Sequence, residues 1–149
     1  MRFGHWAVAT LLVLAAPAAA QAQNAALVNP NTASQEDLAR VPHMTPALVQ
    51  DVIAKRPLAS PLALDAVLAK TLSAEQRKQA YSRMFVPLNL NTATIDDIML
   101  IPGMSRRMSA EFREYRPYRS IGQFRHEIGK YVDKAEVKRL ESYVFVPAK

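Results

Sequence analysis

Asn29-Pro30-Asn31-Thr32-Ala33 and Asn89-Leu90-Asn91-Thr92-Ala93 are two versions of one motif, and they lie 60 residues apart. When residues 28–87 are aligned without gaps against residues 88–147, 16 of the 60 positions are identical. Other identical pairs are Pro42 and Pro102, Met44 and Met104, Arg56-Pro57 and Arg116-Pro117, and Phe85-Val86-Pro87 and Phe145-Val146-Pro147. A repeat that covers nearly the whole chain predicts two copies of one structural unit.

The spacing of apolar and capping residues within each copy is helical. Polar residues that favour helix N-caps precede the apolar runs. The predicted N-caps are Ser34, Thr45 and Ser73 in the first copy and Thr94, Ser105 and Asp133 in the second. Pro42 and Pro102 end the first helix of each copy, and third helices are expected around residues 61–69 and 121–129. The sequence therefore predicts an all-α protein with four short helices per copy and almost no strand.

The beginning of the chain has the pattern of a secretory signal peptide. Residues 7–16 form an apolar run that is too short to cross a bilayer, and small residues with A-x-A sites follow it up to Ala20 or Ala22. We expect residues 1–22 to be removed and residues 23–27 to form a short N-terminal segment. The mature protein is then periplasmic or secreted, without a membrane span, and a membrane anchor is the alternative.

Composition limits the remaining possibilities. The formal net charge is +6, or +5 without Arg2, which is compatible with a polyanionic partner but does not require one. No cysteine is present, so disulfides and thiolate zinc sites are excluded. Residues 28–87 and residues 88–147 are each near the lower size limit for an independent core. Because the junction at residues 85–90 has no Gly/Ser linker character, we expect the two copies to pack together or at least to be joined rigidly.

The motifs resemble the helix-hairpin-helix family. The second copy carries the resemblance best, with Leu90-Asn91-Thr92-Ala93, then Asp97-Ile98, then Ile101-Pro102-Gly103-Met104. This pattern is similar to the domain of the DNA receptor ComEA, and the region from Arg116 to Val146 also resembles the photosystem II protein PsbU. The resemblance implies two tandem four-helix units. It implies two different functions, since ComEA-like proteins bind DNA and PsbU is a structural subunit.

In DNA-binding members of this family, the hairpin between two helices presents backbone N–H groups to a phosphate. Glycine permits the close approach and the positive φ, and the next helix adds the positive end of its dipole. The resemblance places this hairpin at Gly103-Met104-Ser105 in the second copy and at His43-Met44-Thr45 in the first. Only the second retains a glycine, so the first is the weaker candidate.

Charge also distinguishes the two copies. Residues 43–59 have a net charge of +1, whereas residues 103–119 contain five arginines and two glutamates and have a net charge of +3. Arg106 and Arg107 follow the second hairpin at the start of a predicted helix, where cations oppose the helix dipole and an anion would relieve the repulsion. Arg113 is a further, weaker candidate contact. An ordinary solvated basic face is the alternative interpretation.

No catalytic or cofactor motif is present. His43 and His126 are isolated and lack metal-ligand spacing, so no metal or other cofactor is expected, and His43 suits a turn with unusual φ. The leading hypothesis is a non-enzymatic, exported protein that binds double-stranded DNA weakly and without sequence preference. Its contacts would be Gly103, Met104, Ser105, Arg106 and Arg107. A periplasmic protein-interaction or scaffold module without nucleic-acid binding is the alternative.

Overall fold

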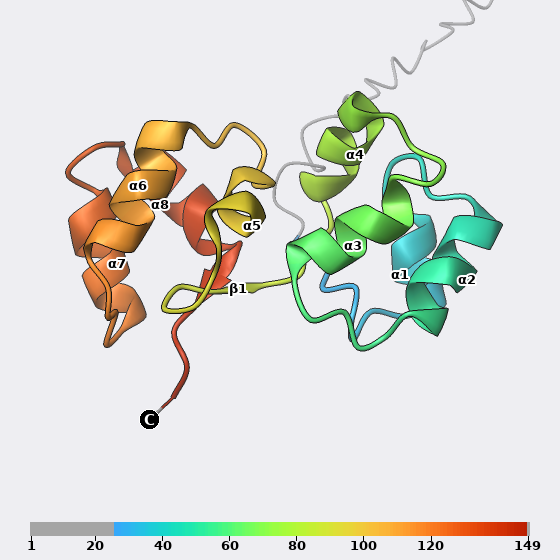
Figure 1. Ribbon diagram of the computed structural model, residues 1–149, viewed down its shortest axis with the longest axis horizontal. Helices are drawn as coiled ribbons and strands as arrows, with labels where there is room; N and C mark the ends of the chain where they lie inside the picture. Colours follow the sequence, from blue (N-terminus) through green and yellow to red (C-terminus); the bar gives the residue numbers. More distant parts are fainter. Residues whose placement is uncertain (1–25, 149) are drawn as a thin grey trace, which may run out of the picture.

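The structure is a computed structural model that describes residues 26–148, so the predicted signal peptide lies outside the described residues. The described chain is mostly helical (Figure 1). The first half contains α1 (Gln35–Ala39), α2 (Pro46–Ala54), α3 (Pro61–Leu68) and α4 (Ala74–Tyr81). The second half contains β1 (Leu88–Asn89), α5 (Ile95–Met99), α6 (Arg106–Glu114), α7 (Ile121–Ile128), α8 (Lys134–Glu141) and β2 (Val144–Phe145). Each helix of the second half begins and ends 60 positions after its counterpart.

The predicted N-caps are confirmed in both halves. Each capping side chain accepts a hydrogen bond from the backbone N–H three residues later. Ser73 and Gln76 form the complete reciprocal capping box. At Asp133 the expected box is incomplete, because the Glu136 carboxylate accepts from Arg139 instead of from the N-cap backbone. Local sequence thus determined where these helices begin.

The repeated Asn and Arg residues join the loop before the first helix of each half to the loop after its second helix. The Asn91 side chain donates to the carbonyl of Tyr118 at 3.0 Å and accepts from its N–H at 2.7 Å. Arg116 donates through Nε to the Leu90 carbonyl at 2.6 Å and through Nη2 to the Ala93 carbonyl at 2.7 Å. Asn31 and Arg56 make the equivalent bonds in the first half. These identities of the repeat therefore serve the fold.

The extended segments that close each half pair with the segments that open it. Leu88–Asn89 pairs in parallel with Val144–Phe145, and an isolated parallel bridge joins Val28 to Met84. The expectation of almost no strand therefore holds, and the short strands bring the two ends of each half together. The part of the chain described by the structure contains no helix that is long and apolar enough to span a membrane.

The two halves touch each other, as the composition of the junction predicted. The Tyr143 ring packs edge-on against Phe85 with 5.0 Å between centroids, and its hydroxyl donates to the Tyr81 carbonyl at 3.1 Å. The Leu62 N–H, in the first turn of α3, donates to the Asp97 carboxylate of α5 at 3.1 Å. Figure 1 shows α5 on the side of the second half that faces α3 and α4.

Candidate nucleic-acid interface

The hairpin of the second half connects α5 to α6 through a tight turn. Gly103 has φ of 78°, a left-handed conformation that is unfavourable for residues with a Cβ. Ser105 is the N-cap of α6, and its hydroxyl accepts from the Met108 N–H at 3.1 Å. Gly103 and Ser105 are exposed, so the turn and the N-terminus of α6 both face solvent.

The backbone donors of this hairpin differ from the expected set. The Met104 N–H donates to the Ile101 carbonyl at 3.0 Å, so it is used inside the turn and is not free for a ligand. Within residues 26–148, no acceptor is found for the backbone N–H groups of Gly103, Ser105, Arg106 and Arg107. Met104 contributes a half-buried side chain to the hairpin. The available donors are therefore those of the glycine and of the first helical turn.

Arg106 and Arg107 occupy the first turn of α6, which contains no acidic residue. Both side chains are exposed, and neither forms an ion pair within the described part of the chain. Arg107 lines a hollow of about 300 Å³ that it shares with Lys130 of the loop between α7 and α8. Glu111 lines the same hollow, and Lys130 is paired with Glu127. The unpaired positive charge is therefore that of Arg106 and Arg107 beside the N-terminus of α6.

The other arginines of residues 103–119 do not all belong to this surface. Arg116 is committed to the Leu90 and Ala93 carbonyls. Burial, with a smaller contribution from Arg113, lowers the pKa of the Arg116 guanidinium. Arg113 is exposed but lies in the last turn of α6, about 10 Å along the axis from Arg106 at 1.5 Å per residue. The structure thus brings together Arg106 and Arg107 and leaves Arg113 apart.

The hairpin of the first half has the same backbone conformation but different chemistry. His43 has φ of 66°, which confirms the expected turn with unusual φ, and its Nε2 lies 2.6 Å from Oε1 of Gln79. The Met44 N–H donates to the Val41 carbonyl, and Thr45 caps α2. No arginine starts α2, so these weaker candidate residues form a turn that is occupied by side-chain contacts.

Sequence reasoning missed Arg139, which reaches the second hairpin from α8. Its Nη1 donates to the Pro102 carbonyl at 2.9 Å, while Nε and Nη2 bind the Glu136 carboxylate, each at 2.7 Å. Arg139 is the counterpart of Gln79 at the offset of 60, so the His43–Gln79 pair of the first half corresponds to Gly103 and Arg139. Comparison of these paired positions would have pointed to Arg139.

A cleft of about 380 Å³ separates the second hairpin from the first half. Gly103 and Met104 line it on one side, and Arg77 and Lys78 of α4 line it on the other. Arg77 is paired with Asp65 at 2.8 Å. Lys78 is exposed and forms no ion pair within the described residues, so it places a further cation across from the hairpin.

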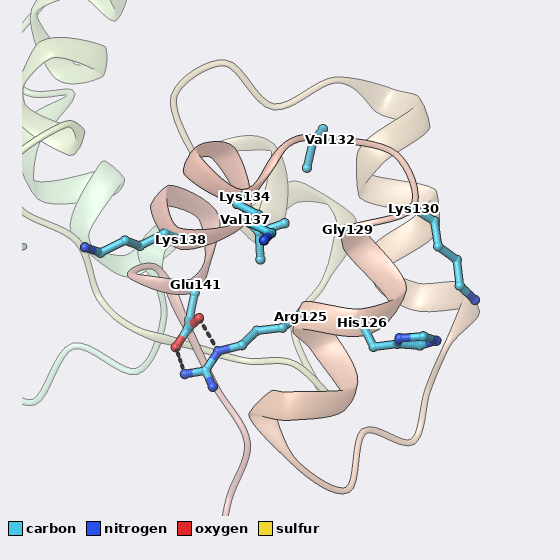
Figure 2. Close-up of a pocket in the computed structure, with 9 residues that line it drawn as sticks. All are labelled: Arg125, His126, Gly129, Lys130, Val132, Lys134, Val137, Lys138 and Glu141. Atoms are coloured by element: carbon cyan, nitrogen blue, oxygen red, sulfur yellow. Dashed lines mark hydrogen bonds and ion pairs between the residues drawn. The ribbon is translucent and has the colours of Figure 1, made fainter.

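A larger pocket of about 830 Å³ lies between α7 and α8, next to the loop at residues 130–134 (Figure 2). Arg125 of α7 reaches across to Glu141 of α8 with two hydrogen bonds of 2.7 and 2.6 Å. Its exposed cations make the pocket positive, but it contains no glycine hairpin. Within the described residues, no cluster of three or more potential metal ligands of the His, Cys, Asp or Glu type occurs.

Comparison of the chain with protein-family models, curated proteins and solved structures finds no match.

Proposed function

We propose that this chain is an exported, non-catalytic protein with two tandem helix-hairpin-helix units that binds double-stranded DNA weakly through its second hairpin. The observation that carries the proposal is the combination at residues 103–107. A glycine with positive φ precedes free backbone N–H groups at a helix N-terminus, and two unpaired arginines flank them. Phosphate suits such a site because it accepts several N–H bonds and carries negative charge.

The contacts would be to the backbone of the duplex and therefore independent of its sequence. Gly103, Ser105 and the first turn of α6 offer N–H groups, and Arg106 and Arg107 offer charge. Phosphate contacts position a protein on DNA but do not read bases. Lys78 across the cleft is the nearest further cation to extend this surface.

The small number of cations explains why binding should be weak and sensitive to salt. Each neutralised phosphate contributes about −0.9 to the slope of log K against log salt, so Arg106 and Arg107 together contribute about −1.8. A fourfold rise in salt concentration would then lower the contribution of these two arginines to the binding constant about twelvefold. Binding that does not respond to salt would be incompatible with this site.

The test is titration of labelled duplex DNA into the mature protein at two salt concentrations. The Arg106→Glu plus Arg107→Glu variant should lose most of the affinity and most of the salt dependence. Lys55→Glu plus Lys70→Glu is a matched control, because it makes the same change in net charge at exposed residues of the first half. Equal losses in both variants would indicate a nonspecific charge effect, and no binding by the unmodified protein would refute the proposal.

The alternative function is that of a periplasmic protein-interaction or scaffold module. The observation in its favour is the pocket between α7 and α8, whose lining combines Val132 and Val137 with charged residues, as many protein interfaces do. An exposed Phe145 at the end of the chain adds apolar surface. Recovery of a stoichiometric protein partner from the periplasm, without nucleic acid, would support this alternative, and failure to recover one would count against it.

A further inference from the structure

In the first half of the chain, one face of the repeat lies across a cleft from the other half, whereas the equivalent face of the second half has no such neighbour within residues 26–148. We call this the trailing face. In the first half it consists of Asp65, Ala74, Arg77, Lys78 and Tyr81, and in the second half of their counterparts Arg125, Lys134, Val137, Lys138 and Glu141. All five residues of the first set line the cleft against the second half, and all five of the second set line the pocket between α7 and α8.

The surface that meets the trailing face of the first half is the leading face of the second. It consists of residues 99–104, which line the same cleft, together with Asp97. Its counterpart in the first half is residues 39–44 with Asp37. Ala39, Arg40 and His43 of this counterpart are exposed. Within the chain, the trailing face of the first half therefore meets the leading face of the second half. The leading face of the first half and the trailing face of the second half have no such partner within residues 26–148.

The polar contact of the internal interface has solvent-exposed equivalents at both ends of the chain. Asp97 is 5% exposed and accepts from the Leu62 N–H in the first turn of α3. The counterpart of Leu62 is Gly122, in the first turn of α7, and its N–H has no acceptor within residues 26–148. The counterpart of Asp97 is Asp37, whose side chain is 49% exposed and whose Oδ1 accepts from Arg40 at 3.2 Å.

We propose that the open trailing face of one copy binds the leading face of the first half of a second copy. The Asp37 carboxylate would then accept from the Gly122 N–H of its neighbour, as Asp97 does from Leu62 within the chain. The proposed contact would share or replace the exposed ion pair of Asp37 with Arg40. The internal interface supplies the geometry for this contact, because the halves share the same elements at a fixed offset. A second copy of this chain is thus the partner that the open face fits.

Charge on the two faces is complementary. Arg125, Lys134 and Lys138 outnumber Glu141 on the open trailing face. Figure 2 shows Lys134 and Val137 projecting from the same side of α8, next to the ion pair that Arg125 makes with Glu141. At the leading face, Arg40 pairs with both Glu36 and Asp37, so these three residues have a net charge of −1, against +2 for the four charged residues of the open trailing face. Opposite charge would therefore favour this association and make it sensitive to salt.

The contact is head-to-tail, so it does not close on itself as a twofold dimer does. Repetition of a heterologous contact gives open chains of molecules unless the rotation closes a ring. Inside the chain, the covalent junction holds the two faces near each other, which is equivalent to an effective concentration of roughly millimolar. Between separate molecules, the contact should therefore become visible at protein concentrations approaching about 1 mM.

Thiol cross-linking provides a direct test, because the chain contains no native cysteine. Two differently tagged proteins are prepared, one with Ala39→Cys and one with Gly122→Cys, and treated with a short bifunctional maleimide. Ala39 is exposed on the leading face, so the Asp37 carboxylate stays in place. Position 122 has room for a side chain, since the nearest atom to an added Cβ is Ser120 Oγ at 3.6 Å. The mixture should give cross-linked heterodimers, whereas each protein alone should give few dimers. Absence of heterodimers near millimolar concentration would overturn the proposal.

Sedimentation of the cysteine-free mature chain gives an independent readout. The average mass should rise continuously with concentration, and Lys134→Glu plus Lys138→Glu should keep the protein monomeric. Lys55→Glu plus Lys70→Glu is the charge-matched control and should still associate. A concentration-independent monomer, or a discrete dimer unaffected by the Lys134 and Lys138 changes, would contradict head-to-tail association.

Discussion

Replacement of Arg116 by lysine should destabilise the protein while leaving its net charge unchanged. Arg116 holds two backbone carbonyls at once, those of Leu90 at 2.6 Å and Ala93 at 2.7 Å. A guanidinium can do this because its N–H groups are arranged in a rigid fork. A lysine ammonium at this position can reach only one of the two carbonyls, so the other loses its partner.

The expected loss follows from the number of bonds. A hydrogen bond to a charged group contributes about 1.5–3 kcal/mol to stability, so loss of one bond should cost about 2 kcal/mol. Arg116→Ala removes both bonds and the packing of the side chain, and should cost about 4 kcal/mol. For a chain of this size, 2 kcal/mol corresponds to a fall in Tm of roughly 6–10 °C.

Chemical denaturation followed by circular dichroism measures this difference directly. Arg116→Lys should lower the midpoint without changing the m-value, because the folded and unfolded surfaces remain the same. Arg113→Lys is the matched control, since Arg113 is exposed and its side chain makes no hydrogen bond or ion pair within the described residues. The control should stay within about 0.5 kcal/mol of the unmodified protein.

DNA titration of the folded Arg116→Lys protein distinguishes a structural arginine from a phosphate contact. Affinity should be unchanged, because the Arg116 side chain faces two backbone carbonyls and not the hairpin surface. Unchanged stability combined with weaker DNA binding would refute the reasoning. Arg116 would then belong with Arg106 and Arg107.

Three further predictions concern the hairpin and the core. Gly103→Ala should lower the free energy of unfolding by about 1–2 kcal/mol, because φ of 78° is unfavourable for a residue with a Cβ. Steric contact does not add to this cost, since the nearest atom to an added Cβ is Arg139 Nη2 at 3.7 Å. Tyr118→Phe should leave stability at neutral pH unchanged or raise it, since the buried hydroxyl has no partner within residues 26–148. Burial raises the pKa of Tyr118 and of Tyr143 in the folded protein. The free energy of unfolding should therefore keep its full value below pH 10. Above pH 10 it should fall by about 1.4 kcal/mol per pH unit for each tyrosine, because these residues ionise in the unfolded chain first. Tyr118→Phe should remove the contribution of Tyr118 to this pH dependence. If the unfolding midpoint changes with pH as steeply in the variant as in the unmodified protein above pH 10, the prediction is wrong.

Local patterns in the sequence predicted the helices and their beginnings because capping depends on neighbours within three residues. Ser34 and Ser105 bind N–H groups in their own first turns, so no distant contact was needed to place them. The unusual φ at His43 was predicted for the same reason, since a proline and a following N-cap define the turn. These features depend on backbone geometry more than on tertiary packing.

The environment of individual side chains could not be predicted in this way. Asp37 and Asp97 are identical in the repeat, and each lies three residues after the N-cap of its helix. The Asp37 side chain is nevertheless 49% exposed, whereas Asp97 is 5% exposed. The difference arises from Leu62, which lies 35 residues from Asp97 in the sequence and belongs to the other half. Tertiary contact therefore separates residues that the repeat makes equivalent.

The two hairpins also show how one backbone conformation can carry two different surfaces. In the first half a histidine takes positive φ and lies against Gln79. In the second half glycine takes positive φ, and Arg139 occupies the equivalent position on α8 and binds the Pro102 carbonyl. The first arrangement fills the turn with the His43 and Gln79 side chains, whereas the second leaves the backbone exposed beside arginines. This difference at paired positions is why we propose phosphate binding at the second hairpin, whereas the proposed self-association rests on the trailing and leading faces of the repeat.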